Sequence, residues 1–289
     1  AALWSHEARK ESPMKFEREL EVARAAALRA GEIVLASYSR LTEKQVDQKG
    51  LNDYVTVVDH ASQRLLVEAL RAAFPSDTIV AEETLAHDIN LHADPRRRWY
   101  IDPLDGTTNY IHAYPMFAVT LALEVDGDLV VAVTYAPIHR EMFHAVRGEG
   151  AYNNDVRMQV SRLEEPNRIL LGTGFPFRAR HLLGTYLASF ALFFNRSRGV
   201  RRGGAAALDL AYVAAGRLDG FWELTLSPWD IAAGVLLVEE AGGRVTDFFG
   251  GRTFMETGHV IVTNGLLHDW MLEGIASVFP RDGDYAKRS

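Results

Sequence analysis

The chain has 289 residues, of which 48% are hydrophobic and 24% are charged, so it can bury a large core in one large domain or two closely joined subdomains. It contains no cysteine, which excludes disulfides, thiolate zinc sites and cysteine nucleophiles. A formal net charge of −7 leaves no basic footprint for nucleic acid, and the absence of a signal pattern or a membrane-length apolar run predicts a cytoplasmic protein.

The first predicted element is a long helix. Apolar residues recur at helical spacing from Phe16 to Tyr38, which predicts an amphipathic helix over that range. Residues 1–13, which precede Met14, show no such periodicity. We expect them to be either a remnant added ahead of the natural start or a natural disordered extension.

Three short predicted strands are each followed by an acidic residue. The strands span Tyr54–Val58, Thr78–Ala81 and Trp99–Ile101, and the acids that follow them are Asp59, Glu82 and Asp102. A second helical pattern runs over Ala61–Phe74 and ends at Pro75, so Asp59 should lie at a helix N-terminus. The basic run Arg96–Arg98 is predicted to be a solvated loop ahead of the third strand.

The second part of the chain changes from a meander to alternating helices and strands. Meander strands are expected at Phe117–Val125, Leu129–Ala136 and Glu141–Val146, with an aspartate-glycine hairpin at residues 126–128. Later strands are expected at Ile169–Gly172, Leu218–Leu224 and Val260–Thr263, and helices at His181–Phe194, Ala205–Ala215, Pro228–Ala241 and Leu266–Val278. The change predicts two subdomains with a cleft between them, an N-terminal α+β part over residues 14–150 with most metal ligands and a C-terminal α/β part over 151–289.

The stretch Trp99–Asn109 places Asp102 and Asp105 three residues apart, where an apolar strand breaks into a turn. Carboxylates in such a place lose solvation, which is unfavourable unless a bound cation compensates. Hard cations such as Mg²⁺ take oxygen ligands. Gly106 lets the backbone approach a ligand, and the N–H groups and threonine hydroxyls that follow can donate to an anion. The alternative is an Asp-Pro turn and an Asp-Gly turn, with a threonine that caps a short helix.

Four acids occur where a strand ends or a helix begins, and they are Glu82, Asp102, Asp105 and Asp230. A fold that brings these ends together would gather carboxylates that need cations, and two Mg²⁺ ions about 4 Å apart could assist an in-line displacement at phosphorus. Taken singly, Glu82 can be a solvated loop acid, and Asp59 and Asp230 can be helix caps. The histidines show no zinc-binding spacing and are interpreted as structural or exposed: His112, His139, His144, His181 and His259.

Four segments resemble, in order, the signatures of the inositol monophosphatase family. They are Asp53–Asp59, Glu82–Thr84, Trp99–Asn109 and Trp229–Gly234, and the similarity extends from about Phe16 to Val278. The resemblance implies a layered αβαβα sugar-phosphatase sandwich that combines α+β and α/β parts. It also implies hydrolysis of myo-inositol monophosphate by a metal-activated water, without a covalent phosphoenzyme, in a homodimer that Li⁺ inhibits.

The resemblance further implies a role for each residue of the site. Two or three Mg²⁺ ions would be held by Glu82, Asp102, the carbonyl of Leu104, Asp105 and Asp230. Asp59 and Thr107 would orient and deprotonate the attacking water, and the N–H groups of Gly106 and Thr107 would hold the phosphate.

On the substrate side, the resemblance places Lys49 in a flexible loop near the site, and Ala206 and Glu223 at positions that contact the inositol ring. The chain departs from many members at Gly203–Ala205, where they carry threonine or serine. Metal binding is untouched by that change, but hydroxyl contacts to the substrate are altered. The resemblance therefore specifies the reaction type better than the substrate.

Two alternatives to an inositol phosphatase stay open at this point. One is a phosphatase of the same family for fructose 1,6-bisphosphate or another sugar or nucleotide phosphate. The other is a binding role, because some bacterial relatives act in transcription complexes that mature ribosomal RNA. Since the chain is acidic, that role is expected to use protein partners, with no direct contact to nucleic acid or membrane.

Overall fold

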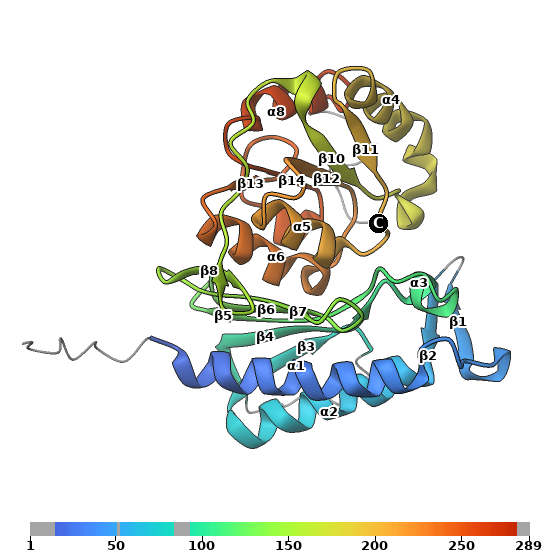
Figure 1. The fold of residues 1–289 in the computed structure, drawn as a ribbon, viewed down its shortest axis with the longest axis vertical. Helices are drawn as coiled ribbons and strands as arrows, with labels where there is room; N and C mark the ends of the chain where they lie inside the picture. The colour runs from blue at the N-terminus through green and yellow to red at the C-terminus, as the bar shows by residue number, and fades with distance from the viewer. Residues whose placement is uncertain (1–14, 51–52, 84–92, 282–289) are drawn as a thin grey trace, which may run out of the picture.

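The computed structural model describes residues 15–50, 53–83 and 93–281, so the expectation for residues 1–13 lies outside the described residues. Helix and sheet layers alternate as α, β, α, β, α in Figure 1. This arrangement confirms the predicted layered αβαβα sandwich. Among the described residues, no helix is both long and apolar enough to cross a bilayer.

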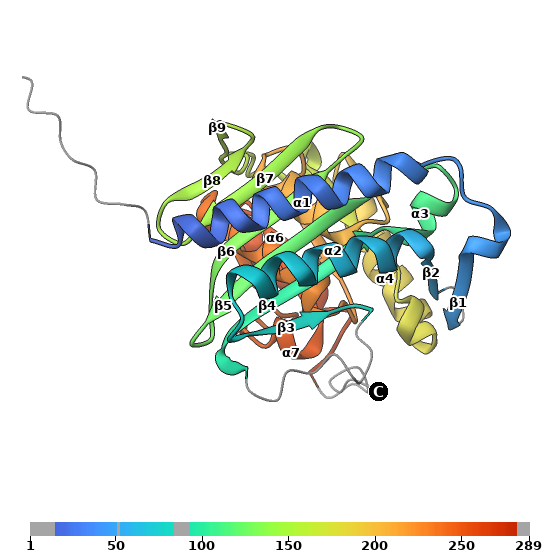
Figure 2. The same cartoon turned by 90° about the horizontal axis from the view of Figure 1, so that it is seen from below.

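The outer helix layer consists of α1 (Glu17–Ser37) and α2 (Val57–Ala73), which lie side by side on one face of a sheet (Figure 2). Small residues of α1, among them Ala23 and Ala27, are fully buried, so the helix packs closely. The predicted strand Tyr54–Val58 is wrong at its end, because β2 (Asp53–Thr56) stops two residues earlier. The side chain of Thr56 accepts hydrogen bonds from the next turn and starts α2 at Val57.

A seven-stranded sheet forms the second layer, in the order β3-β4-β5-β6-β7-β8-β9. Its strands are β3 (Asp77–Ala81), β4 (Asp94–Asp105), β5 (Ala118–Val125), β6 (Asp128–Ala136), β7 (Glu141–Val146), β8 (Gly150–Asn153) and β9 (Val156–Arg157). Strands β3 and β4 run parallel, and the other neighbours are antiparallel. The predicted hairpin between β5 and β6 is confirmed, since Asp126 (φ 53°) and Gly127 (φ 89°) form its two-residue turn.

The predicted solvated loop at Arg96–Arg98 is wrong, because these residues belong to β4. Arg97 and Arg98 are paired with β5, Arg98 is also paired with Thr78 of β3, and the carbonyl of Arg96 accepts the N–H of Asp126. Their charges are matched by acids of neighbouring elements: Arg97 contacts Asp77 at 2.9 Å and Glu19 at 3.0 Å. The strand can therefore be basic at its start and apolar further on.

A five-stranded sheet forms the fourth layer, in the order β11-β10-β12-β14-β13. Its strands are β10 (Leu170–Thr173), β11 (Gly199–Arg201), β12 (Gly220–Glu223), β13 (Arg244–Thr246) and β14 (Val260–Thr263). The helices α5 (Ala206–Ala214) and α6 (Pro228–Glu240) lie between the two sheets, and α4 (Leu183–Phe194) and α8 (His268–Ala276) cover the far face (Figure 1).

The described residues form three apolar clusters: one beneath α1 and α2, one around the middle helices, and one beneath α4 and α8. The central cluster joins residues of β5 and β6 to those of α5, α6, β12 and β14, so the two sheets share one core through the middle helices. The short helix expected after the Asp-Gly turn is α3 (Thr107–Ile111), although its cap is Gly106 and not a threonine. The remaining elements are short and were not predicted: β1 (Val46–Gly50), α7 (Phe254–Thr257) and the 3₁₀ turns Glu43–Gln45, Pro166–Arg168 and Phe177–Leu182. The division near residue 150 stays a prediction.

Candidate active site

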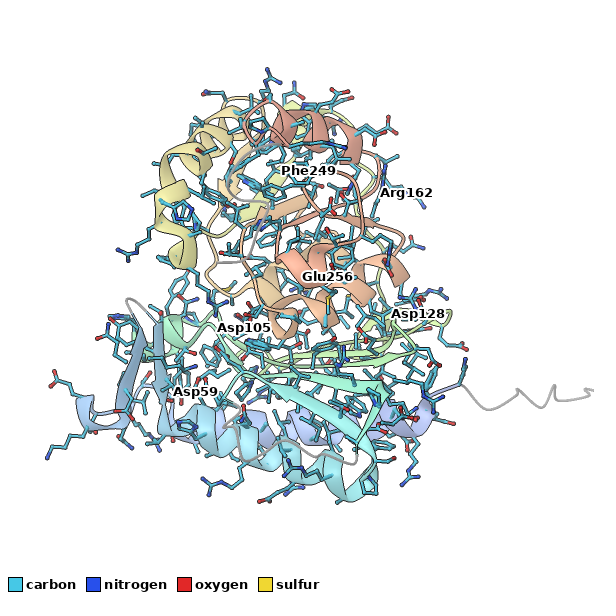
Figure 3. The ribbon with its side chains drawn as sticks, turned by 180° about the vertical axis from the view of Figure 1, so that it is seen from behind. Asp59, Asp105, Asp128, Arg162, Phe249 and Glu256 are labelled. Atoms are coloured by element: carbon cyan, nitrogen blue, oxygen red, sulfur yellow. The ribbon has the colours of Figure 1, made fainter. Side chains whose placement is uncertain are left out.

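A cavity of about 910 Å³ opens where the ends of β4 and β12 meet the first turns of α3, α5 and α6. Its walls include all four of the acids expected to meet there, Glu82, Asp102, Asp105 and Asp230. Thr107, Ala206 and Glu223 also line it. Figure 3 shows Asp59 and Asp105 at the same end of the sandwich, away from Asp128 at the far end of the β5-β6 hairpin.

The parallel pairing of β3 and β4 brings two of the acids together. Because Ala81 lies opposite Ile101, the residues that follow, Glu82 just after β3 and Asp102 in β4, lie side by side. The N–H of Glu82 still donates to the carbonyl of Ile101 at 3.2 Å. The register of the β4-β5 pairing then shifts between Asp102 and Asp105, so the backbone of β4 is irregular at this point.

Each of the three aspartates has one carboxylate oxygen held by a backbone N–H group. Leu104 donates to Asp102 at 2.9 Å, Ala207 to Asp105 at 2.8 Å, and Ser227 to Asp230 at 2.7 Å. Asp230 belongs to the capping box that starts α6, so the predicted helix-cap role exists alongside its place in the cavity. These bonds orient the carboxylates before any ligand binds.

Burial is the main reason why the site disfavours negative charge. It raises the pKa of Asp102 well above the ordinary range, and the nearby Glu82, Asp105 and Asp230 raise it further. Burial likewise raises the pKa of Asp105, with Asp230 as the strongest neighbouring charge. A cation in the cavity would relieve both effects, since it replaces lost solvation and screens the repulsion.

The donor set fits a hard divalent cation such as Mg²⁺, because the cavity offers carboxylate, carbonyl and hydroxyl oxygens from a chain without cysteine. In the described residues, however, no three acidic or histidine side chains already form a closed metal-binding group. The acids therefore occupy the walls of one cavity and do not form a compact cage. Mg²⁺ commonly keeps several water ligands and one or two carboxylates, which suits such an open arrangement.

Asp59 and Thr107 form a hydrogen-bonded pair beside the acids. The hydroxyl of Thr107 lies 3.0 Å from one oxygen of Asp59 and 3.0 Å from the carbonyl of Leu104. The other oxygen of Asp59 accepts the N–H of Thr56 at 2.8 Å and its hydroxyl at 2.5 Å. Burial raises the pKa of Asp59 to about 6, although the bonds from Thr56 oppose that rise.

Gly106 and Thr107 form the start of α3 at the cavity wall. Gly106 has φ 90°, and a Cβ there would lie 2.8 Å from the carbonyl of Met116 and 3.2 Å from Ala205. Glycine is thus required both by its backbone conformation and by close packing. The segment before α5 is linked to α3 by a hydrogen bond: the side-chain amide of Asn109 donates to the carbonyl of Gly203 at 3.0 Å.

Lys49 lies at the edge of the site on β1, and not in a loop as the resemblance implied. Its ammonium is 3.5 Å from Glu82 and in direct contact with Glu83. Glu223 lies on the opposite side of the cavity at the end of β12. Burial raises the pKa of Glu223 well above its ordinary value, and Asp209 raises it further while Arg202 opposes the rise.

Several cavity residues were not predicted: Tyr54, His112, Gly174, Phe175, Phe177, Arg178 and Arg202. Arg202 lies 5.0 Å from the ring centre of Phe177, and Arg178 lies 2.9 Å from the hydroxyl of Ser227 and 3.7 Å from Asp230. The one available signal was the aromatic and basic run at residues 175–180, which directly follows a predicted strand. Nothing local in that run indicates that it faces α6.

Residues 16–279 match the profile of the inositol monophosphatase family. Nus factor SuhB of Pseudomonas aeruginosa is 48% identical over 248 residues, which cover 85% of this chain and 91% of that protein. Among solved structures, extragenic suppressor protein suhB from Bartonella henselae is similar with a TM-score of 0.85 and 39% identity, covering 90% of this chain and 98% of that one. Inositol monophosphatase from Anabaena (Nostoc) is similar with a TM-score of 0.82 and 39% identity, covering 93% and 99%.

Proposed function

The chain belongs to the inositol monophosphatase family, and from that premise we propose that it is a Mg²⁺-dependent phosphomonoesterase. The observation that carries the proposal is the single cavity lined by Glu82, Asp102, Asp105 and Asp230, which reach it from three separate parts of the chain. Carboxylates placed together in this way suit a divalent cation and a phosphate ester.

We propose that two or three Mg²⁺ ions are held by Glu82, Asp102, the carbonyl of Leu104, Asp105 and Asp230. When bound, Mg²⁺ supplies Lewis-acid polarisation of the phosphate and makes a water molecule more acidic. The protein contributes the orientation of the carboxylates, through the backbone bonds to Asp102, Asp105 and Asp230.

Asp59 and Thr107 would act as the proton acceptor for the attacking water. The water gives its proton to the hydroxyl oxygen of Thr107, while the hydroxyl proton of Thr107 passes to the Asp59 oxygen 3.0 Å away. A pKa of about 6 suits this role, since a general base works best when its pKa lies near the operating pH. The N–H groups of Gly106 and Thr107 would hold the phosphate, and attack is direct, without a covalent phosphoenzyme.

The substrate that we propose is a myo-inositol monophosphate, which gives myo-inositol and phosphate. Glu223 and Ala206 line the cavity and would contact the ring. Lys49, close to Glu82, would adjust the charge of the site. Inhibition by Li⁺ and a homodimer are part of the same proposal. Fructose 1,6-bisphosphate and other sugar or nucleotide phosphates are the alternative substrates.

A substrate panel with purified protein and Mg²⁺ tests the proposal. We expect turnover of inositol monophosphates, and a strong preference for fructose 1,6-bisphosphate would overturn the inositol assignment. Asp105→Asn and Asp230→Asn should weaken Mg²⁺ binding and lower turnover by about 10²-fold or more with the fold intact. Asp269→Asn, at an exposed aspartate, is the matched control. Wild-type turnover in either cavity variant would contradict the site.

A second candidate function is a binding role in a transcription complex. Relatives at 44–48% identity carry the name Nus factor SuhB. One feature of this chain favours a protein partner: residues 166–208 contain seven arginines and no aspartate or glutamate, although the whole chain has a net charge of −7. All seven arginines are exposed. Arg178 and Arg202 line the cavity and Arg168 pairs with Glu165, so the basic surface consists of the four others, Arg180, Arg196, Arg198 and Arg201, next to α4 and in β11. We propose that this basic surface binds an acidic protein surface.

Complementation of a deletion strain separates the two functions. If the binding role is the essential one, Asp102→Asn should abolish phosphate release and still complement. The paired variant Arg196→Glu with Arg198→Glu should do the reverse, because it keeps the cavity and inverts the basic surface. Failure of Asp102→Asn to complement, together with complementation by the charge-reversed protein, would contradict the binding role.

A further inference from the structure

Gly174 and Glu223 lie next to each other at the cavity end of the five-stranded sheet. Strands β10 and β12 are parallel, and Thr173 is paired with Trp222, so Gly174, just after β10, lies beside Glu223, the last residue of β12. Both Gly174 and Glu223 line the cavity. Gly174 is buried, and it was not among the residues that the sequence singled out.

The carboxyl group of Glu223 occupies the space that a side chain at position 174 would need. A Cβ built on Gly174 would fall onto the three carboxyl atoms of Glu223, well inside the 3.0 Å that real Cβ atoms essentially never show. Gly174 is not one of the residues with positive φ, so its backbone conformation is open to any amino acid. The requirement for glycine is therefore steric, and the three atoms nearest to the added Cβ all belong to Glu223.

The backbone before Glu223 has little freedom to move away from such a clash. The carbonyl of Trp222 accepts the hydroxyl of Thr173 at 2.8 Å and that of Tyr186 at 3.2 Å. The indole of Trp222 in turn donates to Ser189 at 3.2 Å, which ties the end of β12 to α4. Trp222 and Tyr186 are fully buried. A larger residue at 174 would thus displace the flexible carboxyl group of Glu223 and leave the strand in place.

We propose that Gly174 is a specificity-determining residue, whose missing side chain lets the Glu223 carboxylate lie across β10 and face the cavity. There the carboxylate can accept hydrogen bonds from hydroxyl groups close to the scissile phosphate. The ligand class that this arrangement selects is a phosphate monoester of a polyol, in preference to an ester without neighbouring hydroxyls. The inference rests on the proposed phosphatase function and assigns a residue to its selectivity.

A double-mutant cycle with Gly174→Ala and Glu223→Ala tests the inference. The readout is the ratio of kcat/KM for myo-inositol 1-phosphate to kcat/KM for p-nitrophenyl phosphate, which has no hydroxyl groups. Gly174→Ala should lower that ratio about tenfold, mainly through KM for the polyol ester, as expected when a hydrogen bond to substrate is lost. Glu223→Ala should lower it as well. In the Glu223→Ala background, Gly174→Ala should have little further effect, because the clash is gone.

Gly184→Ala is the matched control, since a Cβ at that position in α4 would have no atom within 4 Å. It should keep the wild-type ratio. A crystal structure of Gly174→Ala should show the Glu223 carboxyl group displaced from its place over β10, and thermal unfolding of the four proteins of the cycle would report any loss of fold.

The inference is overturned if Gly174→Ala keeps the wild-type ratio, if its effect is equally large in the Glu223→Ala background, or if the Glu223 carboxyl group does not move. A wild-type protein that hydrolyses neither ester would instead contradict the proposed function. In that case the position of the carboxyl group in the Gly174→Ala crystal structure still decides whether Gly174 places Glu223.

Discussion

The two oxygens of the Asp59 carboxylate serve different ends. One oxygen accepts the N–H and hydroxyl of Thr56 and completes the capping box that starts α2. The other accepts the hydroxyl of Thr107. A helix cap and a catalytic base are therefore not competing interpretations of this residue. The same holds for Asp230, which completes the capping box of α6 with Ser227 and lines the cavity.

Thr107 offers a sharp test at the residue scale. Thr107→Val keeps the shape of the side chain and removes the hydroxyl between Asp59 and the carbonyl of Leu104, so turnover should fall about 10²–10⁴-fold. Thr107→Ser keeps the hydroxyl and should retain most of the activity. Steady-state kinetics of both variants check this expectation, and equal turnover of the two would show that the hydroxyl takes no part in proton transfer.

The acidic residues of the site could be predicted from the sequence, whereas other residues of the cavity could not. Asp102 and Asp105 stand out because acids next to an apolar strand need a local reason. Gly174 and Arg178 carry no such signal, since their importance comes from Glu223 and Ser227, which lie about 50 positions later in the chain. Contacts of that kind depend on the pairing of β10 with β12, which local periodicity does not encode.

At the scale of elements, the predictions fail where one element decides the state of another. Val57 and Val58 have strand propensity, yet they lie in α2 because Thr56 caps the helix in front of them. Arg96–Arg98 lie in β4 because β5 pairs with the strand there and β3 joins it at Arg98. The long helix α1 and strand β14 were predicted almost to their ends, since the residue pattern within each segment is enough to indicate the element.

Close packing between α1 and β6 gives a prediction about stability. Gly31 of α1 is buried, and a Cβ there would lie 2.7 Å from Cδ1 of Tyr135 and still closer to its Cε1. Gly31→Ala should therefore destabilise the fold by about 1–3 kcal/mol, although alanine favours a helix by about 1 kcal/mol. Urea unfolding measures this change. Gly184→Ala, whose Cβ meets nothing, should be neutral or stabilising. Equal effects at the two positions would contradict close packing at Gly31.

His268 couples α8 to the edge of the five-stranded sheet and gives a prediction about pH. Its ring nitrogens lie 2.8 Å from the hydroxyl of Thr246 in β13 and 2.9 Å from that of Thr263 in β14. Burial lowers the pKa of His268 from 6.5 to about 4, with a further contribution from Arg244. Between pH 6.5 and 4 the unfolded chain therefore binds the proton that the folded protein does not.

The free energy of unfolding should accordingly be fully maintained above pH 6.5 and fall as the pH drops toward 4, by roughly 3 kcal/mol from this group. Urea unfolding of wild type and His268→Gln at pH 7, 5.5 and 4.5 measures the change, and the variant should show a shallower decline. His60→Gln, at an exposed histidine of α2, is the control. A decline of equal slope in wild type and His268→Gln would show that the pH dependence arises elsewhere.

At the scale of the whole molecule, the cavity joins parts of the chain that the sequence presents separately. Glu82, Asp102 and Asp105 come from the edge of the seven-stranded sheet, whereas Asp230 comes from α6, between the sheets. The predicted division into subdomains near residue 150 would place these acids in two different subdomains. The central core cluster, shared by both sheets, explains why their relative positions can be maintained.

A cation held by these acids should stabilise the whole fold, and this stabilisation is separable from catalysis. Binding at a hundredfold excess over Kd contributes about 2.7 kcal/mol, so Mg²⁺ should raise the thermal midpoint by several degrees. Thermal unfolding with Mg²⁺, with EDTA, and with NaCl at matched ionic strength measures this shift. Asp269→Asn should keep the full shift, because its carboxylate pairs with Arg244 far from the cavity acids.

For Asp105→Asn, the difference in stability from the wild type should depend on whether Mg²⁺ is present. Since burial raises the pKa of Asp105, its ionisation at neutral pH costs stability in the protein without Mg²⁺, and the amide removes that cost. The amide oxygen can still accept the N–H of Ala207. The variant should therefore be as stable as the wild type or more stable in EDTA, and less stable than the wild type in Mg²⁺. A variant that is destabilised equally in both conditions would show that Asp105 supports the fold directly and does not hold a cation.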